Sequence, residues 1–493
     1  MTTRSVDPCQ SRIIAGVARG DITPPVGIYH RMWGAATHDK STGIHRPLTA
    51  TVLTLEAGDT DFAPPPRVAI AVDHCLLWTA EMRNLIERIA QLSEVPTDSL
   101  IVFFSHTHGA GLMGMERRDL PGGELIPPYL DSLATRIAGL VEAAFATAQA
   151  ATISYADGRC SLAQNRDFYD AAGGQFVCGF NPAGEADDRV LVGRVNDRNG
   201  QTIATLVNYA CHPTTLAWDN TLISPDYVGA MREVIEMATG APCFFIQGAS
   251  GDVGPREGFV GDVAVADRNG RQLGYAALSA LTGLPPSDQS FVYAGPVVSG
   301  ATIGTWRYEP IDDAVARRTS IWRSAECVVE LPLRDDLPRR DDLIAERDRW
   351  QATRDAAVAA GDTATAGDAR AMIERVTRRL VRTGHLPTGN SIRFHVSLWR
   401  CGNAIWVPLN GEHYNVLQTT LRSRFPEQTL VIGTLANGSD VWYLPDAESY
   451  GKGLYQEEAS ILAQGSLEIL IDALTGAIRS LITTESADEP AGA

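Results

Sequence analysis

The sequence predicts an α/β fold, with a layered mixed β-sheet core flanked by helices and one inserted helical hairpin. Apolar runs of strand length recur along the 493 residues, and several are continuous, as in strands covered on both faces. Amphipathic helical patterns lie between some of these runs. Polar loops, several with glycine, follow the runs, and ligands in such folds usually bind at the carboxyl ends of strands.

The individual elements follow from these patterns. The runs predicted as strands are residues 67–78, 99–104, 201–210, 242–247, 325–333, 392–409 and 428–435. The predicted helices between them are 79–94, which carries an apolar stripe that includes Leu85 and Ile89, and 129–150.

One segment, residues 336–384, differs from the rest because it is charged and rich in helix formers. It predicts two helices joined by the turn region Gly361–Gly367, packed as a hairpin on the core. We expect a single domain over residues 12–482. The polar end, 483–493, is expected to be a disordered tail.

Composition narrows the classes of partner. A formal net charge of −17 disfavours nucleic acid and anionic membrane surfaces. No run reaches the roughly 18 apolar residues that a membrane span needs, so we expect no membrane insertion. The eight cysteines are scattered without a CxxC pair, and the N-terminus lacks the apolar stretch of a secretory signal. These features favour a cytoplasmic protein whose metal, where there is one, is held by histidines and carboxylates.

Two histidines, His106 and His108, stand one residue apart directly after the apolar run 99–104, in "FFSHTHGAG". At a strand end, the period of two directs both rings to the same side. A pair of neutral imidazoles suits a transition metal or a proton shuttle, and a polar turn with one structural histidine is the alternative.

Other polar groups also follow apolar runs. His212 stands in "NYACHPTTL", and Glu412 stands in "VPLNGEHYN". Gly251, Asp252 and Gly254 belong to "FFIQGASGDVGP", where the glycines allow a close backbone approach and N–H groups for an oxyanion, or simply a tight connection. Because strand ends converge in layered α/β folds, these loops are expected to meet at one cleft.

The ordered motifs "HTHGAG", "NYACHPTTL", "GDVGP", "NGE" and "WYLPDAESYGKGLYQEEAS" resemble those of the neutral/alkaline non-lysosomal ceramidase family. The early stretch "AGVARGDITPP" resembles the opening of that family, and the resemblance spans roughly residues 14–480. It implies an amidase with one Zn²⁺ per chain, whose ligands are His106, His212, Glu412 and Tyr443.

The resemblance also implies roles beside the metal. His108 would handle protons or bind the substrate carbonyl, and Arg166, in "AQNRDFY", would contact the substrate. Asp73 and Asp252 are candidates for carboxylates that orient the ligand imidazoles, or for capping and turn residues. Backbone N–H groups near Gly251 and Gly254 are the candidates for holding an oxyanion.

The sequence departs from the family in two ways. Gly254 stands where the family has a serine, and no C-terminal Ig-like domain is expected. These departures, with the cytoplasmic features, disfavour ceramide itself. We therefore predict a zinc-dependent hydrolase of an amide or ester bond in a small to medium substrate, with homo-oligomerisation left open. The alternative is a non-catalytic relative that binds a metal or small ligand; a metallo-β-lactamase is disfavoured because "HTHGAG" lacks the HxHxDH continuation.

Overall fold

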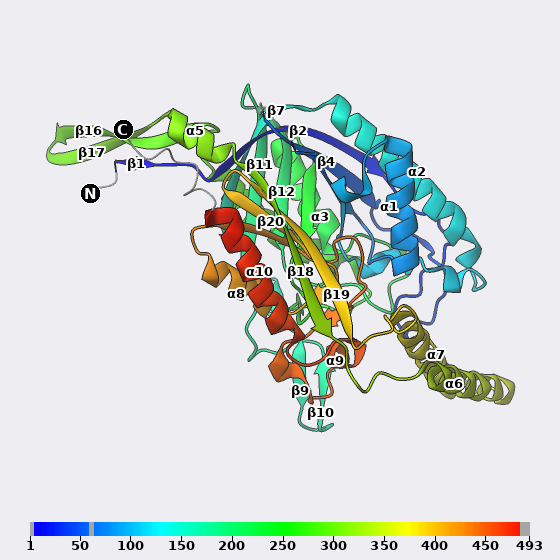
Figure 1. Cartoon of the computed structure of the whole chain (residues 1–493). Coiled ribbons are helices and arrows are strands. Elements are labelled where there is room, and N and C mark those ends of the chain that lie inside the picture. Colours follow the sequence, from blue (N-terminus) through cyan, green and yellow to red (C-terminus); the bar gives the residue numbers. More distant parts are fainter. Residues whose placement is uncertain (1–3, 59–63, 484–493) are drawn as a thin grey trace.

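The core of the protein is a mixed eight-stranded sheet, seen in a computed structural model that describes residues 4–58 and 64–483 (Figure 1). Its strands, in spatial order, are β14 (Cys243–Gln247), β12 (Thr202–Tyr209), β11 (Arg189–Asp197), β7 (Gln149–Arg159), β2 (Gln10–Asp21), β4 (Thr49–Ala57), β5 (Arg67–Val72) and β6 (Leu100–Phe104). The pairs β12/β14 and β5/β6 are parallel and the others are antiparallel. The predicted mixed α/β class is confirmed.

A second sheet packs on one face of the first. It contains β18 (Trp322–Pro332), β19 (Ser391–Cys401), β20 (Ala404–Pro408) and β22 (Thr429–Gly433). Side chains of both sheets share one buried cluster, in which Leu206 and Phe244 of the large sheet join Trp399 and Trp406 of the small one. This sheet-on-sheet contact explains why several strands are apolar on both faces.

Helices cover the two outer faces. On the large sheet lie α1 (Thr79–Ser93), α2 (Ile126–Ala146), α3 (Tyr227–Thr239) and α4 (Val263–Thr282); on the small sheet lie α8 (Val416–Arg424) and α10 (Ser466–Thr483). Alternate residues of one strand serve the two faces: Leu206 of β12 points to the sheet–sheet interior, and Val207 packs under α3 and α4. The result is four layers, helix, sheet, sheet and helix.

The large sheet curls so that its two edge strands approach each other. The rings of Phe103 in β6 and Phe244 in β14 have centroids 6.4 Å apart. The loop after β22 bridges the two edges, because the N–H of Thr434 donates to Gln247 O at 2.8 Å and the N–H of Asn437 donates to Val102 O at 2.8 Å. The carboxyl ends of β6, β12 and β14 are thereby brought together.

Two hairpins extend from this body at opposite ends (Figure 1). One pairs β16 (Gln289–Ser299) with β17 (Ala301–Pro310) and adds the short β1 (Ser5–Val6). The other is the predicted helical hairpin, α6 (Arg340–Ala360) and α7 (Thr363–Arg382). Its turn is shorter than the predicted 361–367 region, because the Asp362 side chain accepts the N–H of Thr365 and starts α7 at once.

Several predicted boundaries were wrong. The run 67–78 forms a strand only to Val72, and the run 392–409 is two strands joined at Gly402, whose φ is 56°. The second predicted helix begins three residues early, at Ile126, with proline in its first turn, and β7 begins at Gln149. Thr483, the first residue of the predicted tail, ends α10, and residues 484–493 lie outside the described part of the chain.

Within the described ranges, no helix combines the length and the apolar character that a membrane span requires. All eight cysteines are free thiols there.

Candidate metal centre

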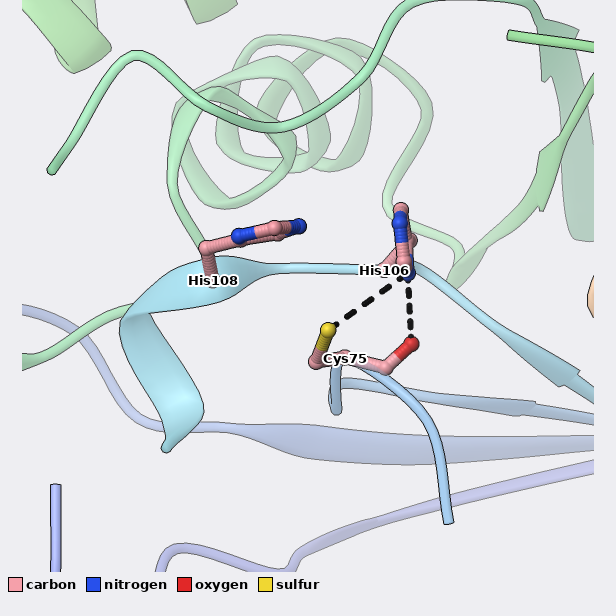
Figure 2. A group of neighbouring side chains, drawn as sticks. All are labelled: Cys75, His106 and His108. Atoms are coloured by element: carbon pink, nitrogen blue, oxygen red, sulfur yellow. Dashed lines mark hydrogen bonds between the residues drawn. The ribbon is translucent and has the colours of Figure 1, made fainter. Parts of the chain in front are cut away.

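The two histidines of the HxH pair lie in the loop that follows β6. His106 has a φ of 67°, in the left-handed region, and His108 begins a short 3-10 turn, His108–Ala110. Their ring centroids are 5.0 Å apart, and Figure 2 shows both rings on one side of the chain. A left-handed turn, rather than the alternation of a strand, therefore brings them together. Such a conformation in a non-glycine residue is costly and is typical of functional sites.

The His106 ring is fixed by the loop after β5. Its Nδ1 lies 2.7 Å from the carbonyl oxygen of Cys75 and 3.6 Å from the Cys75 Sγ, contacts that Figure 2 draws as dashed lines. A carbonyl oxygen only accepts, so Nδ1 carries the hydrogen. In the neutral ring, Nε2 is then left with a lone pair.

His212 is oriented in the same way. It follows β12, and its Nδ1 lies 3.1 Å from the carbonyl oxygen of Ser250, so this nitrogen also donates. The Nε2 atoms of His106 and His212 face each other at 2.9 Å. Both side chains are buried. Two lone pairs thus point at one spot in the interior.

Glu412 brings a carboxylate to the same spot. Its Oε2 lies 3.2 Å from Nε2 of His106 and 3.7 Å from Nε2 of His212. The residue follows Gly411, whose φ of 100° turns the chain after β20, and it pairs with Tyr443 in a short parallel bridge of β21 (Glu412–His413) and β23 (Tyr443–Leu444). Strand pairing therefore places Tyr443 directly beside Glu412, although 31 residues separate them.

This cluster needs a positive charge, which either a proton or a metal ion supplies. Two imidazole lone pairs and a carboxylate repel one another at these distances unless a proton or a metal ion lies between them. Burial would lower the pKa of His106, but the Cys75 and Glu412 side chains raise it well above its ordinary value. The pKa of His212, in contrast, is lowered by burial and by the neighbouring Arg166. The side-chain donor atoms of His106, His212 and Glu412 lie within 4.8 Å of one another, a grouping that could hold a metal ion.

Tyr443 differs from the other three candidate ligands. Burial and the Glu412 carboxylate raise the pKa of its phenol well above the ordinary value. Its hydroxyl oxygen accepts a hydrogen bond from Arg166 Nη2 at 3.1 Å. In the absence of a metal, the phenol is therefore protonated.

His108 lies next to this cluster, but its ring nitrogens make no hydrogen bond to the three residues of the cluster. The centroid lies 5.2 Å from that of His212 and 5.1 Å from that of Trp33. Both ring nitrogens are buried without a hydrogen-bond partner among the described residues. Burial, then His106 and the cations of Arg378 and Arg166, lower its pKa well below the ordinary value. The ring is therefore neutral, and it offers one nitrogen as a hydrogen-bond donor and the other as an acceptor.

Arg166 is held away from solvent. It follows β8 (Ala163–Asn165), and its guanidinium donates to the carbonyl oxygen of Gly251 at 2.6 Å as well as to Tyr443. Only 3% of the residue is exposed. The geometry connects Arg166 to Tyr443 and to the glycine loop.

The predicted orienting carboxylates have other partners. Asp73 accepts from the N–H of Thr49 at 2.9 Å and forms an ion pair with Arg232, and Asp252 accepts from the N–H of Asn415 at 2.6 Å. The prediction that Asp73 and Asp252 orient the imidazoles is wrong, because the two backbone carbonyls described above do so. Burial raises the pKa of Asp252 to about 7.

The two glycines of the oxyanion hypothesis differ in their surroundings. The N–H of Gly251 donates to His413 O at 2.8 Å, so it is not free for an oxyanion, and that part of the prediction is wrong. Gly254, in β15 (Val253–Pro255), has space beside it: a Cβ placed there would lie 3.6 Å from Thr214 Oγ1, 3.8 Å from Arg166 Cδ and 3.9 Å from His212 Cβ. A side chain at position 254 would enter the site without a clash.

Sequence reasoning missed several groups around the site. Backbone carbonyls of Cys75 and Ser250 give no signal in a sequence. The aromatic side chains of Trp33, Trp218 and Phe259, which form a contacting group beside His108, come from loops without any motif.

Two solved structures of ceramidases have a similar architecture. The crystal structure of neutral ceramidase from Pseudomonas aeruginosa matches with a TM-score of 0.62 and 15% identity, over 98% of this chain and 76% of that chain. A ceramidase complexed with C2 matches with a TM-score of 0.63 and 15% identity, over 97% and 76%. No protein-family model and no curated protein matches the sequence. The protein thus has a neutral ceramidase-like fold, as the motifs indicated.

Proposed function

We propose that the protein is a zinc-dependent hydrolase of an amide or ester bond in a small to medium substrate. The observation that carries the proposal is the convergence of three buried groups that could hold a metal ion: the Nε2 atoms of His106 and His212 and Glu412 Oε2. The likeness to ceramidases supports the amide as the bond cleaved. His106, His212, Glu412 and Tyr443 would hold the ion, with one ion per chain.

The chemistry that zinc supplies in such a site is Lewis-acid activation of water and of a carbonyl group. The residues of the chain supply the rest. His108, whose two ring nitrogens have no partner among the described residues, passes the proton of the attacking water to the leaving group. Its lowered pKa makes the ring a weak base that does not retain this proton. Arg166 positions Tyr443 by its hydrogen bond to the phenol oxygen.

The proposed site also bears on the number of domains. Residues 12–482 act as one domain, because the proposed ligands come from loops after β6, β12 and β20 and from β23, elements spread over most of that range. Removal of either sheet would remove part of the ligand set.

The test is an activity screen on protein stripped with a chelator and then reloaded with zinc. We expect hydrolysis of N-acyl 4-nitroanilides or 4-nitrophenyl esters only after reloading. A protein that binds zinc stoichiometrically but turns over none of these compounds would favour the alternative, a non-catalytic relative, which the glycine at position 254 motivates.

A further inference from the structure

The face that α7 turns toward the site is charged. Its apolar residues Val376 and Leu380 pack against Leu343 of α6. A helix on a protein surface usually turns its apolar stripe to the core. Here that stripe is used within the hairpin, although Val381 packs on the main core. A charged row of α7 also meets the body: Glu374, Arg378 and Arg382, spaced four apart.

Arg378 and Glu374 form an ion pair within α7. The Arg378 Nε donates to Glu374 Oε1 at 3.0 Å, and another nitrogen donates to the carbonyl oxygen of Met32, next to Trp33. Arg117 shares the Glu374 carboxylate at 2.5 Å and also pairs with Glu116. Two arginines and two glutamates are therefore balanced in charge at this contact.

Arg382 has no such balance. It is 9% exposed, and among the described residues no carboxylate lies within ion-pair distance of it. Its Nε is buried without a partner, and its Nη2 donates to the Tyr455 hydroxyl at 3.2 Å. The guanidinium lies over the Trp442 ring, 4.7 Å from the centroid. A buried guanidinium with unused donors is costly, and a planar carboxylate satisfies it with two parallel hydrogen bonds.

Arg382 lies close to the proposed metal ligand Tyr443, through contacts with Trp442 and Tyr455. Trp442 immediately precedes the proposed ligand Tyr443, and Tyr455 contacts the Tyr443 ring at 5.8 Å between centroids. Tyr455 is itself 5.9 Å from the Arg382 guanidinium. A pocket of about 120 Å³ opens beside Arg382. Its charged lining consists of the cations Arg334, Arg379 and Arg382 and the carboxylates Asp336 and Glu458, which pair with Arg334 and Arg375. One tyrosine ring, that of Tyr455, thus separates the Arg382 guanidinium from the proposed ligand Tyr443.

We propose that Arg382 binds a carboxylate of the substrate, so that the preferred substrate is an amide with a carboxylate several bonds from the scissile carbonyl. This inference rests on the proposed hydrolase function. The charge of Arg378 on the same face is balanced by Glu374, whereas no partner among the described residues satisfies the Nε of Arg382.

The test compares matched substrates. The 4-nitroanilides of glutaric and suberic acid, each with one free carboxylate, are compared with neutral alkanoyl anilides of equal chain length. We expect the ratio of kcat/KM, acid over neutral, to fall about 10-fold or more in Arg382→Gln, as befits a hydrogen bond to a charged group. Arg382→Lys, which keeps the charge without the planar fork, recovers part of the ratio. Arg354→Gln, a matched loss of charge on α6 where Arg354 pairs with its neighbour Asp355, leaves it unchanged.

A binding measurement separates the two proposals. Suberate is titrated calorimetrically into metal-free protein, where catalysis plays no part. Weaker binding to Arg382→Gln by about 10-fold or more, with Arg354→Gln like the parent, supports the carboxylate site even where no anilide is cleaved. The carboxylate site is overturned when suberate binds equally to the parent and to Arg382→Gln, or when the acid-over-neutral ratio of kcat/KM is unchanged, even where neutral anilides are cleaved. The Arg382 guanidinium then only packs α7 against Trp442.

Discussion

The attachment of the α6/α7 hairpin to the body depends on the buried carboxylate of Glu374. We expect the substitution Glu374→Gln to lower the free energy of unfolding by an amount that depends strongly on pH. Burial would raise the pKa of Glu374, but the charges of Arg117 and Arg378 lower it from 4.5 to about 2. At 1.36 kcal/mol per pKa unit, this difference stabilises the folded protein by about 3 kcal/mol at neutral pH. The side chain is only 12% exposed, so solvent screening is weak.

The sign follows from the lowered pKa. The stabilisation is fully present above the unfolded value of 4.5 and is lost as the pH falls through the folded value of about 2. About 2 kcal/mol of it is gone by pH 3. Glu374→Gln lacks this contribution at every pH, so the difference in unfolding free energy between parent and variant is largest near pH 7 and shrinks between pH 4.5 and pH 3.

Urea unfolding of both proteins at intervals from pH 7 to pH 3 measures this difference. The control is Glu458→Gln, which breaks the more exposed pair with Arg375 on the same helix and is expected to cost at most about 1 kcal/mol. A parent–variant difference for Glu374→Gln that stays constant from pH 7 to pH 3 would refute the assignment of Glu374 as a buried, charged partner of two arginines.

Three further results are expected. Zinc at 1,000 times its Kd is expected to stabilise the fold by about 4 kcal/mol. Because a chain of this length has an unfolding entropy of about 1 kcal/mol/K, the Tm should rise by about 4 °C. In Glu412→Gln, calorimetry should show almost no rise of the Tm with zinc. His108→Gln is expected to keep its zinc by elemental analysis but to lose about 10²- to 10⁴-fold in kcat/KM; activity near that of the parent would remove His108 from the mechanism. Gly254→Ser is expected to change the unfolding free energy by no more than about 1 kcal/mol, since the space beside it is open. Gly270→Ser, whose Cβ would lie 2.2 Å from Tyr227 O, should fail to fold or lose about 3 kcal/mol or more, and equal stability of the two variants would contradict the packing.

The strands that carry the site were predictable because their burial is visible in the sequence. The runs that became β6, β12 and β14 are mainly apolar on both faces, since a helix layer covers one face and the second sheet covers the other. The β16/β17 hairpin was not predicted. Val297, Val298 and Ile303 in it are exposed, so its residues show no division into a buried and a solvent face.

The site was predictable only in part for a similar reason. The side chains of His106, His212 and Glu412 were identified from ordered motifs, and the structure brings them together. What orients them was not predictable, because backbone carbonyls are the same in every residue and because the left-handed turn at His106 has no glycine to mark it. The sequence predicts α7 only as part of a hairpin packed on the core, since nothing in the spacing of its arginines says which face meets the body.

The metal content of the purified protein tests the central claim most directly. Elemental analysis is made on the parent and on a His106→Ala, His212→Ala double variant, after both are offered zinc and dialysed, with circular dichroism to verify the fold. We predict about one zinc per chain in the parent and almost none in the folded variant, as expected for a site that loses both imidazoles. A parent that holds no metal, or a folded variant that holds as much as the parent, would contradict the account.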